Sequence, residues 1–173
     1  MNFAETLSIC SLTVVSLSFG LTVWSFVQQT RASRVTQTER LHEVWWGSEM
    51  METRETVYAL RKDPSRVEAI AAYYHSPLTV SDPPGRQAFS KLIGFFCNIE
   101  ICLRTGLLNE ELTSNLFGEA HYADYQPLIA KLRSTVVANT PPGRTPPKWL
   151  LMTESLEHRL RRRGVEFMHD SMS

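Results

Sequence analysis

The stretch QAFSKLIGFFCNIEICLRT, residues 87–105, decides the fold because its apolar residues recur at helical spacing along its whole length. The residues form two neighbouring stripes: Ala88, Leu92, Phe95, Ile99 and Cys102 on one, and Phe89, Ile93, Phe96 and Leu103 on the other. A helix that is apolar over so wide an arc needs other helices to cover it. The stretch therefore predicts the central helix of a bundle, with Glu100 and Arg104 as a surface pair and Gly106 as the C-cap.

Further helices follow on both sides from the same periodicity and from capping residues. Two apolar stripes between residues 41 and 60 predict a helix that ends at Asp63 and Pro64, and the same pair starts a short helix at 66–74. The prolines and glycine of SPLTVSDPPGR, residues 76–86, indicate a loop. Later helices are expected from Asn109 to Phe117–Gly118, at 122–138 and at 149–163. No alternating strand pattern occurs in the sequence, so the predicted fold class is all-α.

A second apolar stretch, LSICSLTVVSLSFGLTVWSFV, occupies residues 7–27 and carries no charge over its 21 residues. As a helix it would be about 31 Å long, the thickness of one bilayer core. The preceding residues, MNFAET, contain Glu5 and no Lys or Arg, which argues against a cleaved signal peptide. Residues 28–39 are polar but lack Pro and Gly. The sequence therefore predicts an uncleaved transmembrane helix that continues into the helical bundle.

Basic residues predict the direction of this helix. Arg31, Arg34 and Arg40 follow the apolar stretch, and no basic side chain precedes it. The positive-inside rule then places residues 1–6 outside and the helical domain, 28–139, in the cytoplasm, in a single-pass protein of the cell inner membrane. Beyond this domain we expect a proline-rich linker at 140–148, a basic amphipathic helix at 149–164 and a tail at 165–173.

Small and polar residues gather on one side of the predicted membrane helix. The predicted packing face consists of Ser8, Ser11, Ser16, Ser18, Gly20, Thr22 and Ser25. Hydroxyl groups in lipid gain from a partner helix, and small residues let a second backbone approach closely. The alternative is that each hydroxyl bonds to a carbonyl of its own helix.

The run HRLRRRG, residues 158–164, is the densest charge cluster of the chain, and three interpretations remain open. Its cations can favour a helix C-terminus, rest on anionic headgroups, or bind an acidic partner. The candidate contacts with a membrane surface or partner are Arg31, Arg34, Arg159, Arg161, Arg162 and Arg163. Eighteen basic residues balance eighteen acidic ones, so the charge balance argues against a nucleic acid as partner.

No pattern in the sequence predicts catalysis, a cofactor or a metal site. The five histidines occur singly, and the three cysteines have neither metal-binding nor redox spacing. Phosphate-binding loops and nucleophile elbows are absent from the sequence. The Trp45–Trp46 pair is interpreted as part of a core or an interface. We therefore expect a protein that is not an enzyme.

Several motifs resemble a family of bacterial single-pass membrane proteins with a helical cytoplasmic domain, catalogued as a domain of unknown function. The similar residues are Trp45 and Trp46, METRETVYAL (51–60), FFCNIEICLRTGLLNEEL (95–112), LFG (116–118) and PLIAKLR (127–133). The resemblance covers most of residues 7–135. It implies an N-terminal anchor followed by cytoplasmic helices, and it assigns no activity and no catalytic residue.

Two hypotheses of function follow. The first is a non-enzymatic accessory subunit that docks through its membrane helix and its cytoplasmic helices onto a larger bacterial membrane complex, with other membrane protein subunits as partners. Photosynthetic and respiratory complexes recruit subunits of this shape, and no residue selects between them. The second is a membrane-tethered regulator or effector whose helical domain binds a soluble ligand or protein.

Overall fold

The computed structural model describes the backbone of residues 3–75, 81–141, 143 and 145–165, and the side chains of these residues except 3–17, 75 and 120. Every regular element in the described part is a helix, which confirms the predicted all-α class. The elements are α1 (Phe3–Trp46), α2 (Ser48–Leu60), α3 (Pro64–His75), α4 (Arg86–Arg104), α5 (Glu110–Thr113), the π-helix η1 (Ser114–Tyr122), α6 (Ala123–Ala138) and α7 (Lys148–Arg162).

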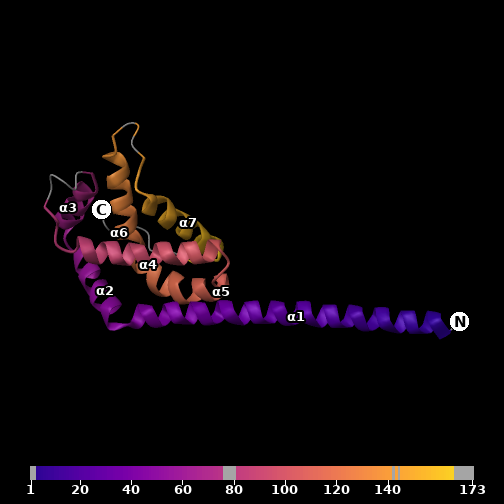
Figure 1. Cartoon of the computed structure of the whole chain (residues 1–173). Coiled ribbons are helices and arrows are strands. Elements are labelled where there is room, and N and C mark those ends of the chain that lie inside the picture. Colours follow the sequence, from indigo (N-terminus) through magenta and orange to yellow (C-terminus); the bar gives the residue numbers. More distant parts are fainter. Residues whose placement is uncertain (1–2, 76–80, 142, 144, 166–173) are drawn as a thin grey trace.

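Helix α1 is much longer than the others, and its N-terminal part projects from a bundle formed by the remaining helices (Figure 1). The chain turns back after α1, so that α2 rises away from it and α4 runs alongside it (Figure 1). Helix α7 packs along α4, and α3 packs against α6. The C-terminal part of α1 thus belongs to the bundle, while its N-terminal part does not.

The core lies around α4, as its two apolar stripes predict. Phe89, Leu92, Phe96 and Ile99 are at most 1% exposed. Burying side chains of this size contributes about 1.5–3 kcal/mol each. Trp45 at the end of α1 is also fully buried, which confirms its predicted place in a core. Helix α7 joins the same core through Leu150, Leu156 and Leu160. The helix at 149–164, which the sequence separates by a linker, is therefore packed as part of the bundle.

The caps predicted around these helices are present. Asp63 Oδ1 accepts a bond from the backbone N–H of Arg66 at 3.4 Å, at the start of α3. Asn109 Oδ1 accepts one from Leu112 at 2.9 Å, at the start of α5. Gly106 adopts φ +70°, and the N–H of Leu107 reaches back to the carbonyl of Cys102 at 2.8 Å, which closes the C-terminus of α4.

The expectation that one helix runs from the membrane segment to Asp63 was wrong. The helix breaks at Gly47, where ψ of 151° takes the backbone out of the helical region and α2 starts in a new direction. A Cβ on Gly47 would lie 3.3 Å from the carbonyl oxygen of Val44, so this turn favours a residue without a side chain. The bend allows Trp45 to reach the core.

The expected helix end near Phe117–Gly118 was also wrong. Residues 114–122 form a π-helix that joins α5 to α6 without a gap. The wider π turn places Phe117 and Tyr122, five residues apart, both at most 1% exposed in the core. Gly118 lies under Val165, because a Cβ at this position would be 2.6 Å from Val165 Cγ2. The glycine therefore serves close packing rather than helix termination.

Within the described part, no helix combines the length and the apolar character needed to cross a membrane, so the predicted transmembrane helix at 7–27 is not supported. The side chains of residues 7–17, the first half of that prediction, lie outside the described residues, as do residues 1–2 and 166–173 of the predicted N-terminus and tail.

Candidate functional site: a projecting helix and the basic end of the bundle

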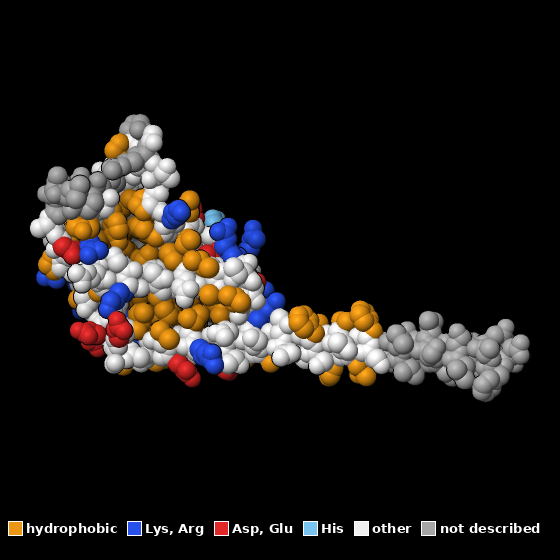
Figure 2. Space-filling view, in the orientation of Figure 1, with side chains coloured by type: hydrophobic (Ala, Val, Ile, Leu, Met, Phe, Trp, Pro, Cys, Tyr) orange, Lys and Arg blue, Asp and Glu red, His pale blue; other side chains and the backbone are white. Residues whose placement is uncertain are grey.

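The part of α1 that projects from the bundle (Figure 1) carries uncovered apolar side chains (Figure 2). All residues from 18 to 29 are exposed. Phe19, Trp24 and Phe26 keep 71%, 63% and 69% of their surface exposed. Consecutive exposed positions on a helix point to all sides, so the described part of this segment is uncovered around its whole circumference. Exposed apolar surface of this extent indicates a site of contact with protein or membrane.

The predicted packing face lies partly on this segment. Ser18, Gly20, Thr22 and Ser25 are all exposed, and no heavy atom lies within 4 Å of the position that a Cβ on Gly20 would take. The Thr22 hydroxyl donates to the carbonyl of Ser18 at 2.8 Å. This hydroxyl therefore bonds to a carbonyl of its own helix, which is the alternative to packing against a partner helix. The side chains of the remaining predicted residues lie outside the described residues: Ser8, Ser11 and Ser16.

Arg31 and Arg34 follow the apolar segment where α1 reaches the bundle. Both side chains are exposed, and neither has a carboxylate partner among the residues that the structure describes. Arg34 lies beside the turn between α4 and α5, because its Nη2 is 3.6 Å from the position of a Cβ on Gly106. Nearby, the buried Thr38 hydroxyl accepts a hydrogen bond from the backbone N–H of Asn109 at 3.2 Å. These contacts join α1 to the bundle.

A buried carboxylate organises the junction of α4 and α7. Glu100 is fully buried, and its Oε1 accepts a bond from the Ser155 hydroxyl at 2.6 Å. Arg159 Nε lies 3.3 Å from Oε2, and the largely exposed Arg104 lies 3.8 Å from Oε1. The predicted pair of Glu100 and Arg104 is therefore present, but the carboxylate is not at the surface, because α7 covers this face of α4 and supplies the polar partners that a buried charge needs.

The other arginines predicted at the end of α7 have different surroundings. Arg159 and Arg163 both reach Glu110 of α5, at 3.5 Å and 3.4 Å. Arg161 pairs with Glu157 at 3.0 Å within α7. These ion pairs favour the structural interpretation for the three residues. Arg162 is exposed and has no carboxylate partner within the described part of the chain.

Cations from three helices meet at the end of the bundle from which α1 projects, and Figure 2 shows Lys and Arg side chains gathered there. We name this surface the basic end, formed by Arg34 of α1, Arg104 of α4, Arg162 of α7 and Arg163, which directly follows α7. The ion pairs at Glu110 and the contact of Arg34 with Gly106 bring these helices together. The sequence predicted Arg104 as the partner of Glu100 and did not predict it as a contact with a membrane or partner. Its position about one turn before Leu107, near the end of the helix, could have indicated that second role.

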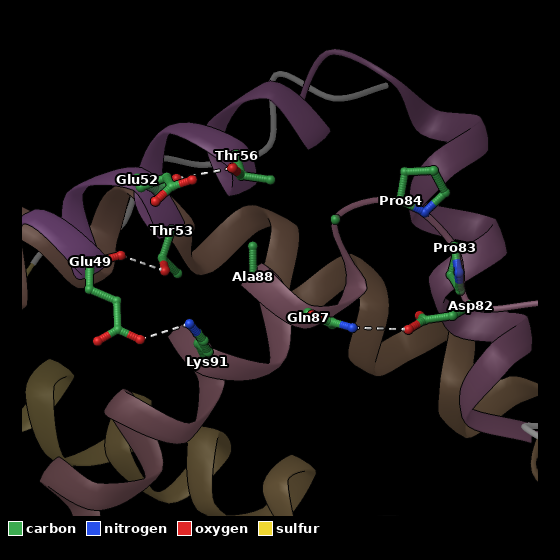
Figure 3. A pocket seen from close by; sticks show the side chains of 11 residues that line it. Glu49, Glu52, Thr53, Thr56, Asp82, Pro83, Pro84, Gln87, Ala88 and Lys91 are labelled. Carbon is green, nitrogen blue, oxygen red and sulfur yellow. Dashed lines mark hydrogen bonds and ion pairs between the residues drawn. The ribbon is translucent and has the colours of Figure 1, made fainter.

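A cavity of about 430 Å³ lies between α2 and the start of α4, and Figure 3 shows its lining. Glu49 and Lys91 face each other across it with Oε1 and Nζ 2.8 Å apart (Figure 3). Hydrogen bonding to Lys91 lowers the pKa of Glu49, and Arg86 lowers the pKa of Asp82 in the same way. The partners of Glu49 and Asp82 therefore favour the ionised form of these two carboxylates.

An aromatic cluster surrounds Arg54 on the other side of α2. The guanidinium carbon of Arg54 lies 4.7 Å from the ring centres of both Trp45 and Trp46. Trp46 Nε1 donates to His42 Nε2 at 3.0 Å, and the ring of the buried His121 is 4.6 Å from that of Trp45. Such cation–π contacts contribute about 0.5–2 kcal/mol each. Sequence reasoning missed this cluster, whose members come from α1, α2 and η1, and its close packing indicates a role in stability.

Two further titratable groups are buried in the core. Burial raises the pKa of the Cys97 thiol to about 11, which keeps it protonated and unreactive. Burial also raises the pKa of Tyr122, whose hydroxyl donates to the carbonyl of Thr153 at 3.2 Å. No group of three His, Cys, Asp or Glu residues in the described part is placed to hold a metal ion.

Comparison with known proteins gives one result. Residues 12–140 match the sequence profile of a family described as "Domain of unknown function (DUF4760)". This confirms the resemblance to a domain of unknown function, and the description carries no statement on bacterial origin or membrane topology. No curated protein and no solved structure matches the chain. The match ends before α7, although α7 packs on α4 within the bundle.

Proposed function

The chain belongs to this family of unknown function, and from that premise we propose that it is a non-enzymatic, membrane-anchored accessory subunit of a larger membrane complex. One observation carries the proposal. A bundle with its own core continues, through a single unbroken helix, into a projecting segment whose apolar side chains are uncovered. Such a segment needs an apolar environment that the rest of the described chain does not supply.

A bilayer fits this need best. The stretch 7–27 holds eleven Leu, Ile, Val and Phe residues, each of which favours insertion by about 0.3–0.6 kcal/mol at mid-depth. Partial coverage by a neighbouring protein helix suits its seven Ser and Thr residues, because a hydroxyl in lipid gains about 0.6 kcal/mol from a partner helix. The apolar residues support a membrane anchor, and the Ser and Thr residues support docking of this anchor against a partner helix.

The basic end supports the same arrangement on the cytoplasmic side. It faces along α1 toward the projecting segment (Figure 2), so the proposed anchor would bring its cations close to the headgroup layer. Each Arg near an anionic leaflet contributes about 1 kcal/mol of attraction. With Arg31 and Arg34 inside, the short N-terminus lies outside and the bundle in the cytoplasm.

The experiment compares two substitutions on the small face with one on the apolar side. Ser18→Leu and Gly20→Leu place bulk where a partner helix would approach, and Val23→Leu enlarges an exposed apolar residue of the same segment as a control. Each full chain is expressed in its native membranes, extracted in mild detergent and sized. The proposal expects wild type and Val23→Leu in a larger complex and the two other variants released from it. If both small-face variants stay in the complex, the proposal is wrong.

A further inference from the structure

A groove of about 640 Å³ separates α1 from the C-terminal half of α4 and the turn that follows it. Figure 1 shows the two helices running side by side here. Its apolar lining includes Phe26, Leu41, Leu107 and Leu108. A volume of this size falls within the range of sites that bind small molecules.

The groove has both apolar and polar walls, with apolar residues at the two ends of the α1 wall and polar ones between them. Phe26 lies at the end nearest the projecting segment, and Leu41 lies about 22 Å further along α1. Between them the wall from α1 carries polar groups, including Gln29 and Ser33, and the guanidinium of Arg34. Of the described lining residues, Arg34 is the charged one, and it has no carboxylate partner among them. A ligand that fits must combine an apolar chain with a negative charge.

The position of the groove narrows the class of ligand further. It begins at Phe26, the residue before the end of the predicted membrane stretch at 7–27. Helical side chains tilt toward the N-terminus, so Arg34 leans toward the proposed membrane. Long basic side chains reach the headgroup layer from such positions.

We propose that this groove binds one anionic phospholipid, with its phosphate at Arg34 and an acyl chain against Phe26, Leu107 and Leu108. The charge of Arg34 selects an anionic headgroup, and the continuity of the groove with the apolar segment of α1 gives the acyl chain its path. A partner helix would need no charge at Arg34. The proposal rests on the membrane location in the proposed function, but not on the existence of a partner complex.

The test uses the full chain purified in mild detergent. Phosphatidylglycerol or phosphatidylcholine with identical acyl chains is added, and native mass spectrometry counts the retained lipids. Wild type is expected to retain one phosphatidylglycerol in clear preference to phosphatidylcholine. Arg34→Gln should weaken phosphatidylglycerol retention about fivefold, the effect of removing one Arg from an anionic lipid.

Two further variants make the result specific. Arg40→Gln is the matched control, because Arg40 is an exposed arginine on α1 that does not line the groove, and its retention should stay within twofold of wild type. Leu107→Ser should weaken the retention of both lipids. Equal retention of the two lipids by wild type would overturn the proposal, as would equal effects of Arg34→Gln and Arg40→Gln. A dimer without lipid would assign the groove to a second copy and would overturn it too.

Loss of lipid selectivity leaves the proposed accessory subunit intact, because sizing of the complex from native membranes tests that proposal separately. Conversely, a monomer that selects phosphatidylglycerol would support the lipid site and contradict the accessory subunit. The two failures are therefore distinguishable.

Discussion

Glu100 of α4 and Ser155 of α7 lie 2.6 Å apart, hydroxyl to carboxylate, with the carboxylate fully buried. The bond joins two helices through residues that are 55 positions apart in sequence. Arg159 and Arg104 also contact the carboxylate, and their side chains extend this network to the surface at the basic end. The same contact that holds α7 on the bundle therefore also positions the cations assigned to the membrane side.

Glu100→Ala should lower the free energy of unfolding by about 3 kcal/mol, because it leaves Ser155 and Arg159 without the group around which they are arranged. Chemical denaturation of the full chain in mild detergent measures the loss. Glu111→Ala, at an exposed residue of α5, is the control and should change stability by no more than about 0.5 kcal/mol. Equal effects of the two substitutions would show that the buried network does not hold α7.

Gly118→Ala should destabilise the bundle by about 1–3 kcal/mol, because the added Cβ would lie 2.6 Å from Val165 Cγ2. Val165→Ala in the same chain should recover part of the loss by making room. Gly94→Ala is the matched control in α4, where no heavy atom lies within 4 Å, and it should stabilise by about 0.5–1 kcal/mol. Thermal unfolding compares the four chains, and a neutral Gly118→Ala would contradict the close packing.

Trp45→Ala should cost about 3–5 kcal/mol, whereas Trp46→Ala should cost about 1 kcal/mol or less. The two residues are neighbours in sequence, but Trp45 is fully buried and Trp46 is 51% exposed. Both variants lose one ring beside Arg54, so the difference reports burial in the core. Denaturation midpoints measure it, and similar losses for the two variants would contradict this difference in burial.

Local patterns in the sequence predicted much of the fold. The stripes of 87–105 identified the central helix because burial on both sides of α4 follows helical periodicity directly. Asp63, Gly106 and Asn109 act through bonds to residues at most five positions away, and their caps were predicted correctly.

The missed features depend on contacts between distant segments. Gly47 interrupts a helical pattern with no flanking breaker, and the neighbouring Trp45 is buried at this bend by residues from distant segments. The π-helix at 114–122 shifts the register of the core face, which no regular period in sequence reveals. The basic end collects Arg34, Arg104 and Arg163 from three helices, so only the packing of α7 on α4 could bring them together.

Acid should weaken the contact between α6 and α7. Burial of Glu157 disfavours its charge, yet hydrogen bonds from Arg161 and Arg133 and the charge of Arg133 hold its pKa below the ordinary value of 4.5. A carboxylate with a depressed pKa stabilises the fold above its unfolded pKa, and this stability is lost as pH falls through the folded pKa.

The stability advantage of wild type over Glu157→Gln should therefore shrink as pH falls from about 6 to about 3. Comparison of the two chains separates Glu157 from the other carboxylates that titrate in this range. Denaturation at a series of pH values measures the difference, and a constant difference would mean that the Arg133 and Arg161 contacts do not favour the ionised form.

The central claim is that the projecting part of α1 enters a bilayer, and Trp24 reports on it most directly because it is 63% exposed and belongs to the predicted membrane stretch. The full chain is reconstituted into vesicles whose acyl chains carry bromine, a contact quencher of tryptophan fluorescence. The difference in emission between wild type and Trp24→Phe isolates Trp24 from the other three tryptophans.

If the projecting part of α1 enters the bilayer, bromine quenches this difference signal, and bromine near the headgroup end of the acyl chain quenches it more than bromine at the methyl end, because Trp24 lies three residues before the C-terminal end of the stretch at 7–27. A Trp24 signal that bromine at either depth leaves unchanged would contradict the membrane anchor and the proposals built on it.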